Sequence, residues 1–169
     1  MALRGRIKQF GCPFCHLIGA LVLHGYLRGY HEQSSDRVVR GHRIYCSRRG
    51  RRCGCGRSFS ALMAGFLSGF TICADSLWRF LSGISAGVEQ VKALHGVLPG
   101  WAAASASRLW RRFSSCQPGI RQLLLRVVAA PPCATAEPVL QTIAHLRAAF
   151  PLAACPLSDF QMQFQTSLL

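Results

Sequence analysis

The chain has 169 residues, which is enough for one ordinary domain or two small ones and excludes a larger set of domains. Half of the residues are hydrophobic, so a packed core is feasible. Twenty Lys and Arg stand against six Asp and Glu, and the resulting net charge of +14 suits a phosphate-rich partner or an anionic membrane surface.

The positive charge is concentrated in the first third of the chain. Residues 1–57 carry eleven Arg, one Lys and two acids, a net charge of +10, whereas residues 58–169 carry a net charge of +4. The same third holds five of the nine cysteines. Closely spaced cysteines without a signal-peptide pattern favour a reducing compartment, where thiols bind metal more often than they form disulfides. We therefore expect a cytoplasmic protein.

The first part of the chain predicts short strands. Strand candidates rich in Val, Leu, Ile and Tyr are residues 20–30, 37–46 and 57–62. The polar segment 31–36 predicts a turn between the first two. Residues 58–74 carry no charge, and the length of this stretch is at the lower limit for a membrane span. The glycines within the stretch and the charges that follow it disfavour a span.

From about residue 72 the apolar residues recur at spacings of three and four, which predicts helices. The expected helices are 74–84, 86–96, 105–113, 119–130 and 137–150. A break is expected at 117–119, around Pro118. The predicted fold class is α+β: a small four-cysteine β unit at 10–62, a helical region at 63–130 and a C-terminal helical tail at 137–169.

The cysteines of the first third have the spacing of a metal site. In Cys12-Pro13-Phe14-Cys15, two residues between the thiolates allow one tight turn to aim both sulfurs at one ion. Thirty residues later come Cys46, Cys53 and Cys55, and a gap of this length suits a β-hairpin between two metal-binding turns, as in a zinc ribbon. The expected ligands of one structural Zn²⁺ ion are Cys12, Cys15, Cys46 and Cys55, with Cys53 as the alternate to Cys46.

Other cysteine chemistry is disfavoured by the sequence. A thiol–disulfide role for the CxxC would need a thioredoxin-like βαβ context, which is absent. A catalytic zinc would need an open ligand position and a nearby base, and no acidic residue lies close to the cysteines in sequence. We therefore do not expect an enzyme.

Four segments together resemble the N-terminal zinc ribbon of bacterial insertion-sequence transposases. They are Cys12-Pro13-Phe14-Cys15, His24-Gly25-Tyr26, Ile44-Tyr45-Cys46 and Cys55-Gly56-Arg57-Ser58-Phe59. The similarity covers residues 10–62, about a third of the chain, and the chain departs from the pattern in a long insert between its last two expected ligands. In that family the ribbon is followed by a helix-turn-helix and both bind transposon DNA. The resemblance implies a DNA-binding protein, with a degenerate helix-turn-helix within 72–128.

Arginines are the expected phosphate contacts of such a protein, and those near the site would also offset the negative charge of a zinc–tetrathiolate centre. They are Arg40, Arg43, Arg48, Arg49, Arg51, Arg52 and Arg57, together with Arg108, Arg111 and Arg112 of the helical region. The six acids are scattered, so the acidic catalytic core of a transposase is not expected. The expected partner is DNA, and a DNA-bound protein of this kind would be associated with the nucleoid. An RNA-binding ribbon, a protein-interaction ribbon and membrane association of 58–84 are the alternatives.

Overall fold

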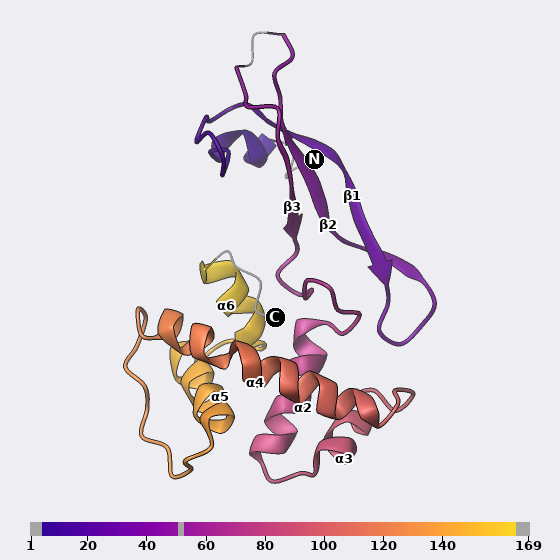
Figure 1. The fold of residues 1–169 in the computed structure, drawn as a ribbon, viewed down its shortest axis with the longest axis vertical. Coiled ribbons are helices and arrows are strands. Elements are labelled where there is room, and N and C mark those ends of the chain that lie inside the picture. The colour runs from indigo at the N-terminus through magenta and orange to yellow at the C-terminus, as the bar shows by residue number, and fades with distance from the viewer. Residues whose placement is uncertain (1–4, 51–52, 165–169) are drawn as a thin grey trace. The chain divides into compact units, whose positions relative to one another are not determined.

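The computed structural model describes residues 5–50 and 53–164, and Figure 1 shows its helices and strands. The chain divides into two compact units. We call Met1–Tyr30 with Asp36–Met63 the sheet unit, and His31–Ser35 with Ala64–Leu169 the helical unit. The presence of both a sheet and helices confirms the predicted α+β class.

The sheet unit contains one three-stranded antiparallel sheet in the order β1-β2-β3. Its strands are β1 (Leu21–Tyr30), β2 (Arg37–Cys46) and β3 (Ser58–Leu62), and a 3-10 turn, η1 (Ile7–Gln9), precedes them. The strands agree with the predicted ranges to within one residue. One face of the sheet is buried on a small core made of Ile7, Cys12, Ala20, Leu21, Ile44 and Cys46.

Within its described residues, up to Phe164, the helical unit has five helices around one core. They are α2 (Ala74–Ser85), α3 (Gln90–His95), α4 (Ala104–Leu124), α5 (Pro138–Ala149) and α6 (Pro156–Phe164). Helix α2 packs on α3, α5 and α6, and α4 packs on α3 and α5. Buried residues of all five helices belong to one hydrophobic cluster, so the segments 63–130 and 137–169 share a core.

Helix α4 continues through Pro118, so the break expected at 117–119 is wrong. A proline inside a helix removes one backbone hydrogen bond and costs about 3 kcal/mol. Phe113 precedes the proline and Ile120 and Leu124 follow it, and all three are buried in the core of the unit. Burying these side chains on both sides of Pro118 offsets the local cost, because each contributes about 1.5–3 kcal/mol.

The turn between β1 and β2 supplies a cap to helix α2. Glu32 accepts hydrogen bonds from the backbone N–H of Cys73 at 2.7 Å and from the Ser76 hydroxyl at 2.6 Å. The indole N–H of Trp101 donates to the Glu32 carbonyl at 2.8 Å. A carboxylate at the start of a helix satisfies free N–H groups and complements the helix dipole.

None of the helices within the described residues is both long enough and apolar enough to cross a membrane. The uncharged stretch 58–74 instead contains strand β3 and the first residue of α2, and Leu67 and Ile72 between them are buried in the core of the helical unit.

Candidate metal centre and basic surface

Four cysteines of the sheet unit converge on one point. The Sγ atoms of Cys12, Cys15, Cys46 and Cys55 all lie within 4.8 Å of one another. The Cys12–Cys55 and Cys15–Cys46 sulfur pairs are each 3.7 Å apart, far beyond the bond length of a disulfide, about 2.05 Å. Such a group of thiols could hold a metal ion.

The first pair of cysteines is presented by a tight turn. The backbone N–H of Phe14 donates to Cys12 Sγ at 3.4 Å, and the N–H of His16 donates to the Cys12 carbonyl at 2.8 Å. His16 has a φ of 58°, which reverses the chain immediately after Cys15. The turn therefore satisfies its own backbone groups while both sulfurs face the same point.

The second pair joins the end of strand β2 to a loop that returns to it. The N–H of Cys55 donates to Cys46 Sγ at 3.3 Å, and the N–H of Gly56 donates to the Cys46 carbonyl at 3.0 Å. A Cβ atom at Gly54 would lie 2.7 Å from Cys46 Sγ, so only glycine fits beside this sulfur. Gly56 has a φ of +73°, a conformation that favours glycine.

The pKa values of two thiols in the cluster shift in opposite directions. Burial disfavours the thiolate of Cys12, but hydrogen bonds from the N–H groups of Phe14 and Cys15 and from neighbouring thiols outweigh it and lower the pKa to about 7. Burial raises the pKa of Cys46 to about 12, because the N–H of Cys55 compensates only in part and the neighbouring thiols add to the increase. A cation among the sulfurs would favour the thiolate form of each.

Cys53, the alternate ligand considered from sequence, is exposed and does not belong to the cluster. Cys46 is the last residue of β2, so the sheet carries its sulfur to the centre. The two ends of the insert 47–54 are joined by a hydrogen bond from the N–H of Gly54 to the carbonyl of Ser47 at 3.0 Å. The long insert between Cys46 and Cys55 is thus accommodated without displacing either sulfur.

The predicted phosphate contacts near the cysteines separate into three groups. Arg43, Arg48, Arg49 and Arg57 are exposed on the sheet unit, and Arg51 and Arg52 lie outside the described residues. Arg40 was predicted with them, but it is only 9% exposed. Its side chain lies across Gly29, where a Cβ atom would be 2.6 Å from Arg40 Cδ. Because a phosphate contact needs an accessible guanidinium, this burial disfavours Arg40 in that role.

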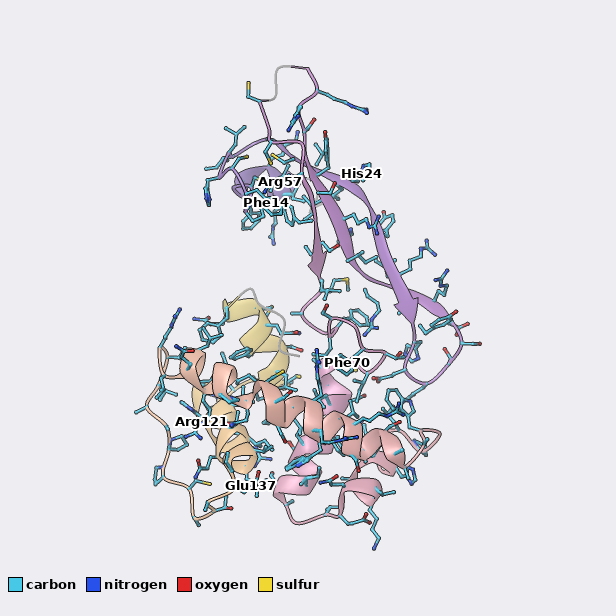
Figure 2. The ribbon with its side chains drawn as sticks, in the orientation of Figure 1. Phe14, His24, Arg57, Phe70, Arg121 and Glu137 are labelled. Carbon is cyan, nitrogen blue, oxygen red and sulfur yellow. The ribbon has the colours of Figure 1, made fainter. Side chains whose placement is uncertain are left out.

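Two exposed arginines are held close to the cysteine cluster. The guanidinium of Arg48 donates a hydrogen bond to the Cys55 carbonyl. The guanidinium carbon of Arg57 lies 5.2 Å from the centre of the ring of Phe14, the residue that precedes Cys15. Figure 2 labels Arg57 and Phe14. A stacked guanidinium of this kind is oriented while its N–H groups stay available to a phosphate.

The three arginines predicted in the helical unit lie on one exposed face of α4. Arg108, Arg111 and Arg112 follow the spacing of three and four residues that places side chains together. Arg108 donates to the Ser105 hydroxyl at 3.1 Å, and the Arg112 guanidinium carbon lies 5.7 Å from the centre of the Phe70 ring. These residues belong to a unit different from that of the cysteines.

Sequence analysis missed a set of exposed aromatic side chains on β1. Tyr26 is 60% exposed and Tyr30 is 56% exposed, and the exposed Arg28 lies between them in the strand. The sequence contained a signal for them, because aromatic and basic residues occupy every second position from 24 to 30, as His, Tyr, Arg and Tyr. Two exposed tyrosines at a spacing of four residues on one strand indicate a surface rather than a core.

Comparison with protein-family models, with curated proteins and with solved structures found no match for this chain. The resemblance to insertion-sequence transposases, which rests on the cysteine turns and the strands between them, therefore stays a prediction.

Proposed function

We propose that Cys12, Cys15, Cys46 and Cys55 hold one structural Zn²⁺ ion, and that the basic surface around this site binds DNA through its phosphates. The observation that carries the proposal is the convergence of four thiols from two turns that are far apart in sequence. In this interpretation the sheet unit is a zinc ribbon. The ion holds in place the segment between Cys46 and Cys55 that carries Arg48 and Arg49, which we call the arginine-bearing loop.

The distances between the sulfur atoms suit zinc. A Zn–S bond is about 2.3 Å long, so the corners of a thiolate tetrahedron lie about 3.8 Å apart. Two of the sulfur pairs, Cys12–Cys55 and Cys15–Cys46, are 3.7 Å apart and agree with this value. Four sulfur ligands leave no open position for water or substrate, so the ion would have a structural role.

The charge of the sheet unit supports a nucleic acid as its partner. The unit carries eleven Arg and one Lys against a single acid, Asp36, a net charge of +11. A Zn²⁺ ion with four thiolates has a formal charge of −2, which two guanidinium groups offset. The remaining positive charge is available to phosphates, whose neutralisation supplies most of the affinity of non-specific nucleic-acid binding.

The resemblance to transposases favours DNA as this nucleic acid, with the arginines of α4 as a second set of contacts. The proposal includes no catalysis. The six acids are scattered in sequence, and within the described part of the chain none of them joins a group of three or more possible metal ligands. Transposase strand transfer depends on acidic residues that hold metal ions.

The proposal is tested by measuring duplex-DNA binding of the full chain by fluorescence anisotropy, at 50 and 200 mM salt, with and without bound zinc. If four phosphates are contacted, affinity should fall about 100-fold between the two salt concentrations. Removing zinc should abolish most of the binding, because the arginine-bearing loop loses its anchor.

Two cysteine substitutions provide the matched pair for this test. Cys55→Ser should lose the bound zinc and the DNA affinity, whereas Cys53→Ser, outside the cluster, should keep both. Zinc-loaded protein that fails to bind duplex DNA at 50 mM salt would contradict the DNA proposal. One zinc per chain in such a protein would still support the metal site.

A further inference from the structure

We infer that the exposed face of strand β1 stacks the unpaired bases of a single-stranded nucleic acid. The surface consists of Tyr26, Arg28 and Tyr30, with His42 and Arg37 opposite them on β2; we call it the tyrosine face. The inference rests on the proposed function and deepens it, because it names the form of nucleic acid that the sheet unit prefers.

The tyrosine face follows from the pleat of β1. Side chains at alternate positions of a strand point to the same side, at a spacing of about 6.6–6.8 Å. Exposure alternates along β1, with positions 26, 28 and 30 exposed and positions 25, 27 and 29 only partly exposed. Tyr26, Arg28 and Tyr30 therefore form one row on one side of the sheet.

Each tyrosine in this row is supported by its partner on β2. Tyr26 pairs with His42, and the two ring centroids lie 5.3 Å apart. Tyr30 pairs with Arg37, whose guanidinium carbon lies 5.6 Å from the centre of the ring. These contacts orient the rings while more than half of each tyrosine stays exposed.

The chemistry of the row matches that of single-stranded nucleic acid. Exposed aromatic rings that alternate with cationic groups bind single strands, because bases stack on the rings and phosphates pair with the cations. In a duplex the faces of the bases are already stacked on one another, so the rings gain nothing from it. Arg28 and Arg37 supply the cations here, and the net charge of +11 on the sheet unit favours an anionic ligand over an apolar peptide.

The opposite face of the sheet provides an internal control. Tyr45 lies three positions from His42 in β2, so its side chain points away from the side that His42 shares with its partner Tyr26. There it meets His24 at a centroid distance of 5.9 Å, because the register shift between Leu23 and Gly25 removes His24 from the row of Tyr26, and Figure 2 labels His24 on β1. Tyr45 thus has the same chemistry as Tyr26 and Tyr30 but lies outside the tyrosine face.

The test compares the full zinc-loaded chain with Tyr26→Leu/Tyr30→Leu, Tyr26→Phe/Tyr30→Phe and Tyr45→Leu. Each protein is titrated into a labelled thymidine 20-mer and into a labelled 20-base-pair duplex at one salt concentration. The leucine pair should lose ten-fold or more in affinity for the single strand, since one base–aromatic stack is worth a factor of roughly 5 to 150. Its duplex affinity should change less than two-fold.

The controls separate stacking from loss of structure. The phenylalanine pair should keep the single-strand affinity because it retains both rings, and Tyr45→Leu should keep it because Tyr45 lies on the other face. An unchanged single-strand affinity of the leucine pair, or an equal loss for the single strand and the duplex, would overturn the inference. Greater loss from Tyr45→Leu than from the leucine pair would assign stacking to the opposite face and overturn it too.

The failure of this inference differs from that of the proposed function. If wild-type protein binds duplex DNA and the leucine pair binds the single strand as tightly as wild type, only the stacking role is wrong. If wild-type protein binds neither oligonucleotide at low salt, the proposed nucleic-acid function is wrong and the inference fails with it.

Discussion

The sheet unit and the helical unit differ in what their folds bury. Among the described residues, the helical unit buries twenty hydrophobic residues in one cluster, whereas the cluster of the sheet unit contains six, of which Cys12 and Cys46 belong to the cysteine centre. The net charge is +3 for the helical unit and +11 for the sheet unit. Small units with few buried side chains need a metal or covalent links for stability. Apolar packing can therefore account for the helical unit, whereas we expect the sheet unit to depend on the proposed metal ion.

Removing the metal should have the largest effect and should separate the two units. Structural zinc contributes about 10–16 kcal/mol in small zinc-binding folds, and losing such a contribution would leave the sheet unit with only its small core. A chelator is therefore expected to unfold the sheet unit and leave the helices intact. Hydrogen exchange followed by mass spectrometry should show lost protection in β1 to β3 and unchanged protection in α2 to α6. Protected strands in metal-free protein would show that the core suffices.

Phe113→Ala should produce the reverse pattern. Phe113 is fully buried in α4, and truncating a buried phenylalanine costs about 3–5 kcal/mol. All three tryptophans belong to the helical unit, so urea unfolding followed by tryptophan fluorescence reports on it. The metal content should be unchanged. As a control, Phe10→Ala in the sheet unit should leave this transition unmoved, because Phe10 is exposed.

Pro118→Ala should stabilise the helical unit by up to about 3 kcal/mol. Alanine restores the backbone N–H that proline lacks and removes the clash with the preceding turn. The midpoint of urea unfolding should rise. Pro138→Ala is the matched control: Pro138 is the first residue of α5, a position that tolerates proline, so this change should have little effect. An unchanged midpoint for Pro118→Ala would mean that the helix has already adapted to the proline.

The smallest expected effect distinguishes an exposed arginine from a buried one. Arg43→Gln should leave stability unchanged and reduce the slope of log affinity against log salt by about 0.9, the value for one phosphate contact with duplex DNA. Arg40→Gln should lower the stability of the sheet unit with little change in that slope, because Arg40 is buried. A slope altered equally by both substitutions would show that Arg40 contacts phosphate despite its burial.

Local patterns predicted much of the sheet unit. The strand boundaries follow from runs of β-branched and aromatic residues, and the grouping of Cys12, Cys15, Cys46 and Cys55 follows from their spacing and the hairpin between them. In both cases the signal lies within short segments, because a turn of two residues or a strand of ten depends mainly on its own side chains.

Tertiary structure decided the rest, for reasons that no short segment contains. Pro118 predicts a helix break, but the shared burial of Phe113, Ile120 and Leu124 keeps α4 continuous. Arg40 is like its neighbours in sequence, and only the packing of its side chain across Gly29 sets it apart.

The same holds for Glu32, which in sequence is an acid in a polar turn. Its hydrogen bonds with Cys73 and Ser76, more than forty positions along the chain, make it a helix cap. Local spacing predicted the three strands and the cysteine group, since these depend on short segments of the chain. Burial and long-range hydrogen bonds depend on how distant segments of the chain meet. They decided which arginines are exposed, that α4 continues through Pro118 and that Glu32 has a structural role.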